Sequence, residues 1–212
     1  MIKAVIFDFG GVITSSPFEA FARYETAHGL PVGLIRTVNA TNPDSNAWAL
    51  LERAEIGLAG FDAMFLSEST ALGHPVPGRD VLPLLAGDVR PGMVAALKAC
   101  KRMFKAGCIT NNVASDDDIG WGSSVHDILA LFDHVIESSK AGLRKPDPRI
   151  YLMMCAALGV APDDCVYLDD LGINCKPAAA LGMTAIKVTG EAQALADLSA
   201  ATGLDLLAAI GA

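Results

Sequence analysis

The chain has 212 residues, of which 52% are hydrophobic, and a formal net charge of −8 at pH 7. The length fits one sizeable domain, or a domain that carries a smaller insertion. The acidic balance provides no basic stripe for nucleic acid, and no apolar run approaches the roughly 18 residues of a membrane span. The N-terminus lacks a signal-peptide pattern, because the apolar run after Lys3 ends at Asp8. We therefore expect a cytoplasmic protein without a nucleic-acid or membrane partner.

The predicted elements begin with a short strand, "KAVIFD", over residues 3–8. The next stretch, residues 16–87, is helical in pattern and contains no comparable β run. After it, short β runs alternate with longer helical patterns. The predicted strands there are 104–110, 134–138, 165–170 and 184–188, and the predicted helices are 91–102, 147–160, 176–183 and 190–211. This alternation predicts an α/β fold in which helices cover both faces of a five-stranded parallel sheet.

The segment 16–87 interrupts the alternation. Three helical patterns within it each end at a glycine, and they cover residues 18–29, 47–57 and 61–73. We interpret the segment as a helical cap over the carboxyl edge of the sheet. Residues 1–15 and 88–212 then form the α/β core domain. Four arginines of the cap are candidate substrate contacts: Arg23, Arg36, Arg53 and Arg79.

Polar side chains stand where three of the predicted strands end. Asp8 closes the first strand, Thr110 the second, and the pair Asp169 and Asp170 the fourth. Ligands of open α/β sheets bind outside the carboxyl ends of the strands, near a topological switch point. Lys145 lies on the loop after the third strand. We expect these acids, the hydroxyl and the cation to converge on one edge of the sheet.

This combination is typical of phosphoryl chemistry. Asp8 and Asp169 would supply the hard oxygen ligands that Mg²⁺ prefers. Gly10 and Gly11 remove side chains where the backbone must approach an anion, and they leave N–H groups as donors. The hydroxyl and the cation of the set can bind phosphate oxygens. A carboxylate nucleophile that attacks phosphorus gives an aspartyl-phosphate, which divides one hard step into two easier ones.

At these residues the chain resembles the haloacid dehalogenase-like (HAD) superfamily of hydrolases, over essentially its whole length. The stretch "DFGGV" is similar to the family's first motif, with Asp8 as the nucleophile, and "ITNN" is similar to its second motif, with Thr110 as the phosphate-binding hydroxyl. The third motif is Lys145 in "GLRKPDP", and the fourth is "DDLGIN", with Asp169 and Asp170. The order and spacing of the four motifs carry the resemblance, because any one of them is common.

The resemblance implies a Rossmann-like core and a helical cap between the first two motifs. It also implies Mg²⁺ as the cofactor, held by Asp8, Asp169, Asp170 and the carbonyl of Gly10. By the same resemblance, Asn111 lies beside the phosphate and Asn174 holds the fourth motif. Asp8 and Lys145 are the expected catalytic residues. The expected substrate-binding residues are Gly10, Gly11, Thr110, Asn111 and Lys145.

The first motif departs from the pattern of most phosphatases in this family. Those carry a second aspartate two residues after the nucleophile, which protonates the leaving oxygen and later activates water. Gly10 stands at that position here. Without the acid, we expect good leaving groups, such as those of sugar 1-phosphates, to be preferred and the aspartyl-phosphate to accumulate. An acid from the cap, Glu52 or Glu55, is the alternative, and it predicts no accumulation.

The sequence therefore predicts a magnesium-dependent phosphatase of a small phosphorylated metabolite. Two other interpretations stay open. A haloacid dehalogenase also has a single aspartate in the first motif and needs no metal, but it typically lacks the paired acids that Asp169 and Asp170 supply. A binding or regulatory protein with the same fold is the second, and the missing acid at Gly10 favours it. The sequence predicts neither the identity of the substrate nor an oligomeric state.

Overall fold

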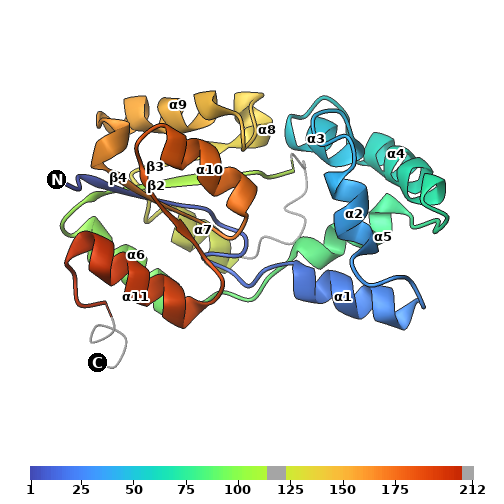
Figure 1. Ribbon diagram of the computed structural model, residues 1–212, viewed down its shortest axis with the longest axis horizontal. Helices are drawn as coiled ribbons and strands as arrows, with labels where there is room; N and C mark the ends of the chain where they lie inside the picture. The colour runs from blue at the N-terminus through green and yellow to red at the C-terminus, as the bar shows by residue number, and fades with distance from the viewer. Residues whose placement is uncertain (114–122, 207–212) are drawn as a thin grey trace.

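The computed structural model describes residues 1–113 and 123–206. A sheet with helices on both faces forms one part of the molecule, and a group of helices from the N-terminal half forms the other (Figure 1). In the part of the chain that is described, no helix has the length and apolar character needed to cross a membrane.

The sheet has five parallel strands in the order β3-β2-β1-β4-β5. The strands are β1 (Ala4–Phe7), β2 (Lys105–Thr110), β3 (His134–Glu137), β4 (Cys165–Asp169) and β5 (Thr184–Lys187). The predicted α/β class with a five-stranded parallel sheet is confirmed. Because β1 lies in the middle and pairs with both β2 and β4, the chain leaves it at the switch point of the sheet.

Side chains alternate between the two faces of the sheet, as the period of a strand requires. In β1, Val5 and Phe7 pack on one face, whereas Ala4 and Ile6 pack on the other. The first face is covered by α6 (Pro91–Lys101), α7 (Ser123–Leu129) and α11 (Glu191–Thr202). The second face is covered by α8 (Ser138–Ala141), α9 (Pro148–Leu158) and α10 (Gly172–Ala180), and η2 (Pro162–Asp164) leads into β4. Figure 1 shows α6 and α11 opposite α9 and α10.

Residues 16–87 contain helices and no strand. The elements are α1 (Phe18–Ala27), α2 (Leu34–Ala40), α3 (Ala47–Glu52), α4 (Leu58–Ala71), α5 (Gly78–Val81) and η1 (Leu82–Leu85). They bury an apolar cluster of their own, in which the rings of Trp48 and Phe61 pack edge to face with centroids 4.8 Å apart. Outside this segment, an isolated antiparallel bridge between Thr14 and Val89 joins the two connections to the sheet.

Some helix boundaries differ from the predicted ones. The helical pattern over 47–57 ends at Glu52, and Ala54 has a φ of 58°, which no helix continues through. The helix predicted from residue 176 begins at Gly172 and contains Pro177. A proline inside a helix is unfavourable, so the sequence favoured a later start.

Other boundaries follow the local sequence closely. The Asp147 side chain accepts a hydrogen bond from the Arg149 amide at 2.9 Å and caps α9, at the residue where the sequence predicted this helix to begin. For the final helices predicted over about 190–211, the described residues contain one helix, α11, which ends before Gly203, whose φ of 76° suits a glycine cap. Residues 207–212 of that prediction lie outside the described residues.

Candidate active site

Three strand ends bring polar side chains to one edge of the sheet. Asp8 directly follows β1, Thr110 ends β2 and Asp169 ends β4. Phe7 lies beside Cys108 of β2 and Leu168 of β4, so the three strands end at nearly the same level. Asp8, Thr110 and Asp169 are 7%, 4% and 0% exposed, so their polar atoms need partners inside the protein.

Lys145 reaches this edge from the loop between α8 and α9. Its side chain is 1% exposed, and Nζ lies 2.7 Å from Oδ1 of Asp8 and 2.9 Å from Oδ2 of Asp169. One buried ammonium therefore serves two buried carboxylates. Such charges stay in an apolar interior only when they are paired and hydrogen-bonded.

A second layer fixes the Asp169 carboxylate. The Tyr167 hydroxyl donates to Oδ2, and Nδ2 of Asn174 lies within 3.2 Å of both carboxylate oxygens. The Leu171 amide donates to Oδ1 at 2.8 Å, immediately before the first turn of α10. Sequence reasoning missed Tyr167. The signal was its place two residues before Asp169, which puts both side chains on the same face of β4.

Asp170 adds a third carboxylate. Its Oδ2 accepts a hydrogen bond of 3.0 Å from the Ser16 hydroxyl. Gly11 lies directly against it: the φ of Gly11 is +76°, and a Cβ there would stand 2.2 Å from that oxygen. Only glycine satisfies both the left-handed backbone and the close approach. Oxygens of Asp8, Asp169 and Asp170 lie within 4.8 Å of one another. With Lys145, these three acids form what we call the strand-end cluster.

Burial and like charges dominate the electrostatics of this cluster. Burial, with the Asp169 and Asp170 charges, raises the pKa of Asp8 well above its usual range, although Lys145 opposes the shift. Burial and the Asp169 charge also raise the pKa of Asp170. Burial lowers the pKa of Lys145, but Asp169 and Asp8 outweigh it and hold the pKa above its ordinary value. Three carboxylates thus face one ammonium, a surplus that a divalent cation would neutralise.

Gly10 and Thr110 each offer a feature that a ligand could use, open space at Gly10 and a hydroxyl at Thr110. A Cβ at Gly10, the position of the missing acid, would meet no atom within 4 Å. Among the described residues, the Thr110 hydroxyl takes no hydrogen bond, although the residue is buried. Both positions belong to the predicted substrate-binding set.

Asn111, which was also predicted to bind substrate, uses its side chain for hydrogen bonds within the protein. Its Oδ1 accepts from the Lys145 amide at 2.9 Å, and its Nδ2 donates to the Lys145 carbonyl at 3.1 Å. The side chain therefore clamps the main chain that carries Lys145. Its Nδ2 also lies 3.1 Å from Oε2 of Glu52.

Glu52, the last residue of α3, connects the helical segment to the sheet edge. Nε of Arg144 donates to Oε2 of Glu52 at 2.6 Å, and Nη1 of Arg144 donates to the Pro43 carbonyl at 2.8 Å. We call Glu52, Arg144 and Asn111 the cap contact. Sequence reasoning did not identify Arg144, whose only signal was its place beside Lys145.

Three of the four arginines named as candidate substrate contacts have partners within the helical segment, whereas Arg23 of α1 has none among the described residues. Arg53 pairs with Glu55, and Arg79 pairs with Asp62. The Arg36 guanidinium lies 4.2 Å from the centre of the Phe18 ring.

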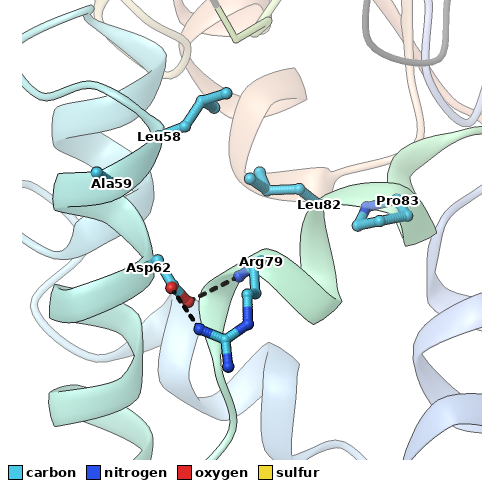
Figure 2. Close-up of a pocket in the computed structure, with 6 residues that line it drawn as sticks. All are labelled: Leu58, Ala59, Asp62, Arg79, Leu82 and Pro83. Carbon is cyan, nitrogen blue, oxygen red and sulfur yellow. Dashed lines mark hydrogen bonds and ion pairs between the residues drawn. The ribbon is translucent and has the colours of Figure 1, made fainter.

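One pocket lies among α4, α5 and η1, away from the strand ends. Figure 2 shows the Asp62 side chain bonded to the backbone and the guanidinium of Arg79, each at 3.0 Å. The lining residues are Leu58, Ala59, Asp62, Arg79, Leu82 and Pro83. None of them belongs to the strand-end cluster or to the cap contact.

Comparison with known proteins matches this geometry to a family. A family model described as haloacid dehalogenase-like hydrolase matches residues 2–182. The chain is 32% identical to acyl-CoA dehydrogenase family member 10 of Mus musculus over 96% of its own length and 19% of that protein. It is 29% identical to phosphatase MT3486 of Mycobacterium tuberculosis over 91% of its length and 89% of that protein. The chain spans only 19% to 40% of the first curated relatives that it matches.

The fold also has solved counterparts. A HAD family enzyme from Bacteroides thetaiotaomicron, crystallised with magnesium and inorganic phosphate, superposes with a TM-score of 0.60. The match covers 88% of this chain and 94% of that one at 18% identity, so it concerns the fold.

Proposed function

The chain belongs to the haloacid dehalogenase-like hydrolase family, and we propose that it is a magnesium-dependent phosphatase of small phosphorylated metabolites. The observation that carries this proposal is the buried Asp8 carboxylate, 2.7 Å from the Lys145 ammonium, at an edge where three carboxylates meet. A relative of similar length that is named a phosphatase supports the choice of substrate class.

The donor set of the strand-end cluster fits a magnesium ion. Oxygens of Asp8, Asp169 and Asp170 lie within 4.8 Å of one another, and carboxylate oxygens are the ligands that Mg²⁺ prefers. Together with the carbonyl of Gly10, these residues would hold the ion. When bound, magnesium supplies positive charge that balances the phosphate and the charge that develops during its transfer.

Asp8 is the proposed nucleophile. The Lys145 ammonium and the Phe9 amide, each 2.7 Å from Oδ1, fix the orientation of its carboxylate. The carboxylate attacks phosphorus, and the bond to the leaving oxygen breaks with its electron pair. Water then attacks the aspartyl-phosphate at phosphorus, which releases phosphate and restores Asp8.

Two groups would bind the phosphate oxygens. A lysine ammonium has three donors, and Lys145 uses two of them on Asp8 and Asp169, so one remains. Thr110 offers a hydroxyl beside it at the end of β2. In this proposal residues 16–87 act as the cap domain over a core of 1–15 and 88–212, and the lack of an acid in the first motif, at Gly10, favours leaving groups such as those of sugar 1-phosphates.

A phosphatase assay tests the proposal. We expect phosphate release from an aryl phosphate and from members of a panel of phosphorylated metabolites, with magnesium present. Excess chelator should abolish it, and restored magnesium should recover it. Undiminished turnover in chelator contradicts the metal assignment. Halide release from a 2-haloacid without phosphate release makes the protein a dehalogenase, and no turnover on any substrate supports a binding role.

A further inference from the structure

The first motif provides no acid to protonate the leaving oxygen, because Gly10 has no side chain. A phosphatase with alcohol leaving groups needs one, since a positioned acid or base contributes about 10²- to 10⁴-fold to such a step. Building on the proposed function, we infer that Glu52, from helix α3 of the cap, is the general acid and base of the reaction. The acid would thus come from a different part of the chain.

The bonds of Glu52 place its carboxylate at the phosphate-binding residues. Its Oε2 accepts from Arg144, which precedes Lys145, and from Asn111, which follows Thr110. Asn111 in turn clamps the main chain of Lys145 with two hydrogen bonds, at 2.9 Å and 3.1 Å. Glu52 is therefore hydrogen-bonded to the residue before Lys145 and to the residue after Thr110, the two residues that would bind phosphate.

The second oxygen of Glu52 is available for proton transfer. Oε1 takes no hydrogen bond among the described residues, and it is not a fully buried atom. The side chain as a whole is 15% exposed. Among the described residues, Oε2 is thus hydrogen-bonded and Oε1 is not. The bonds to Oε2 orient the carboxyl group, and Oε1 stays available to donate or accept a proton.

The charges around Glu52 are compatible with a proton carrier. Burial raises the pKa of Glu52 above its ordinary value, while Arg144 and Lys145 act against the shift. The neighbouring Arg53 is engaged by Glu55. The carboxyl group therefore keeps its proton to a higher pH than an exposed glutamate does, a shift in the direction that a proton donor needs.

No other described acid of the cap is placed in this way. The Glu55 side chain is 51% exposed and pairs with Arg53. Glu25 is buried, but its two oxygens accept from the amides of Gly33 and Ile35 within the cap. Of the acids in residues 16–87, only Glu52 has hydrogen bonds or ion pairs to core residues in the described structure.

The proposed proton transfers balance in both steps. As Asp8 attacks phosphorus, the bond from phosphorus to the leaving oxygen breaks, and that oxygen takes the proton of Glu52. The Glu52 carboxylate then takes a proton from the water that attacks the aspartyl-phosphate. The bond between phosphorus and Asp8 breaks, and inorganic phosphate leaves with Asp8 and Glu52 in their starting forms.

The test compares Glu52→Gln with Glu55→Gln on phosphate monoesters whose leaving groups range from an acidic phenol to an alkyl alcohol. Glutamine keeps an accepting oxygen for Arg144 and Asn111 but carries no transferable proton. We expect the loss of kcat/KM in Glu52→Gln to grow along the series, up to about 10²- to 10⁴-fold on the alkyl phosphate. Glu55→Gln should match the wild type throughout.

Rapid-quench kinetics and pH profiles distinguish proton transfer by Glu52 from a purely structural role, because loss of a structural contact would change neither the burst nor the pH dependence. Wild-type enzyme should release the phenol linearly, whereas Glu52→Gln should show a burst, because water activation is slowed. The alkaline limb of the pH profile on the alkyl phosphate should vanish in Glu52→Gln. In Arg144→Gln it should move to higher pH, because a positive charge that lowers the pKa of Glu52 is gone.

Three results would overturn the inference or its premise. A loss of equal size for every leaving group, with a linear time course in Glu52→Gln, would show that Glu52 only positions the cap. A Glu52→Gln variant as active as the wild type would show that it has no role. A wild-type protein that releases phosphate from no member of the series would overturn the proposed function, and this inference with it.

Discussion

The strand-end cluster and the cap contact, which we propose to act at one site, are built in opposite ways. The cluster is mostly buried, with Asp170 partly exposed, and Lys145, Tyr167, Asn174 and a backbone amide hold the Asp169 carboxylate in one position. The cap contact depends on one carboxylate, at the end of a helix of six residues, and on its bonds to Arg144 and Asn111.

Because of this difference in structure, we expect the two regions to have different functions in the reaction. Phosphoryl transfer needs a nucleophile and an electrostatic environment that are fixed before the substrate arrives, and in our proposal the strand ends provide both. A proton donor must meet leaving groups of different shapes, and a cap that closes over the substrate can bring it and exclude water. Substitutions in the cluster should therefore abolish activity, whereas those in the cap contact should change activity according to the substrate.

The largest expected effect is at Asp8. Asp8→Asn removes the nucleophile and a proposed metal ligand, so turnover should fall by a factor on the order of 10⁴ or more. Circular dichroism and thermal unfolding should show a folded protein. Asp163→Asn, at an exposed position on η2, is the matched control and should keep full activity. Near-normal rates in Asp8→Asn would mean that the nucleophile lies elsewhere.

Substitution of Lys145 tests whether the ammonium stabilises the folded protein in addition to binding phosphate. In metal-free buffer, Lys145→Met should lower the free energy of unfolding by about 3 kcal/mol, because it leaves buried carboxylates unpaired. Lys101→Met removes the exposed pair with Asp133, at 3.1 Å, and should cost no more than about 1 kcal/mol. Urea unfolding measures both, and equal losses would contradict the distinction between buried and exposed pairs. Phosphatase activity should be lost only in Lys145→Met.

The next test moves the acid from the cap to the core. In a Glu52→Gln background, Gly10→Asp should regain at least about tenfold in turnover of an alkyl phosphate, because a positioned acid returns. The space at Gly10 admits a side chain. Gly10→Asn in the same background has the same size without the acid and should regain nothing. Equal activity of the two double variants would count against proton transfer as the missing function.

The smallest effect concerns stability and pH at the cap contact. The pKa of Glu52 is raised in the folded protein, so its protonated form contributes stability that is full below the unfolded value of 4.5 and lost as pH rises through the folded pKa. Glu52→Gln keeps a neutral group. Relative to wild type, its free energy of unfolding should therefore rise as pH increases from the unfolded value of 4.5 through the raised folded pKa, by roughly 1 kcal/mol or less.

Glu55→Gln controls this comparison. The hydrogen bond from Arg53 lowers the pKa of Glu55, so the stability linked to its ionisation is lost as pH falls below the unfolded value of 4.5 and does not change as pH rises above the range in which the unfolded group ionises. The difference from wild type should then be flat, and a parallel rise in both variants would contradict a specific effect of Glu52.

The sequence could predict the strand-end cluster because strand ends are local features. Each of Asp8, Thr110 and Asp169 follows an apolar run, and parallel strands end at a common edge, so their proximity needed no knowledge of packing. Tyr167 could also have been predicted, because side chains alternate along a strand and Tyr167 lies two residues before Asp169, but the sequence analysis missed it. The start of α10 was misjudged because Pro177 disfavours a helix locally, whereas the bond from Leu171 to Asp169 fixes the start where the acid lies.

The cap contact could not be predicted in the same way. Glu52 and Glu55 are both acids near the end of one helical pattern, and the sequence left them as equal candidates. The helix ends at Glu52, the chain turns at Ala54 with a positive φ, and Glu55 is turned to the surface. Which acid meets Arg144 depends on how the cap packs against the core, and no local pattern contains that information.

Trapping the phosphorylated enzyme tests the central claim most directly. Wild-type protein and Glu52→Gln, turning over an aryl phosphate with magnesium, would be quenched in acid at successive times and mapped by mass spectrometry. We predict a phosphoryl group on the peptide that contains Asp8, labile to hydroxylamine, at a higher level in Glu52→Gln. Phosphate release through several turnovers with Asp8 unmodified at every time in both proteins would contradict the account.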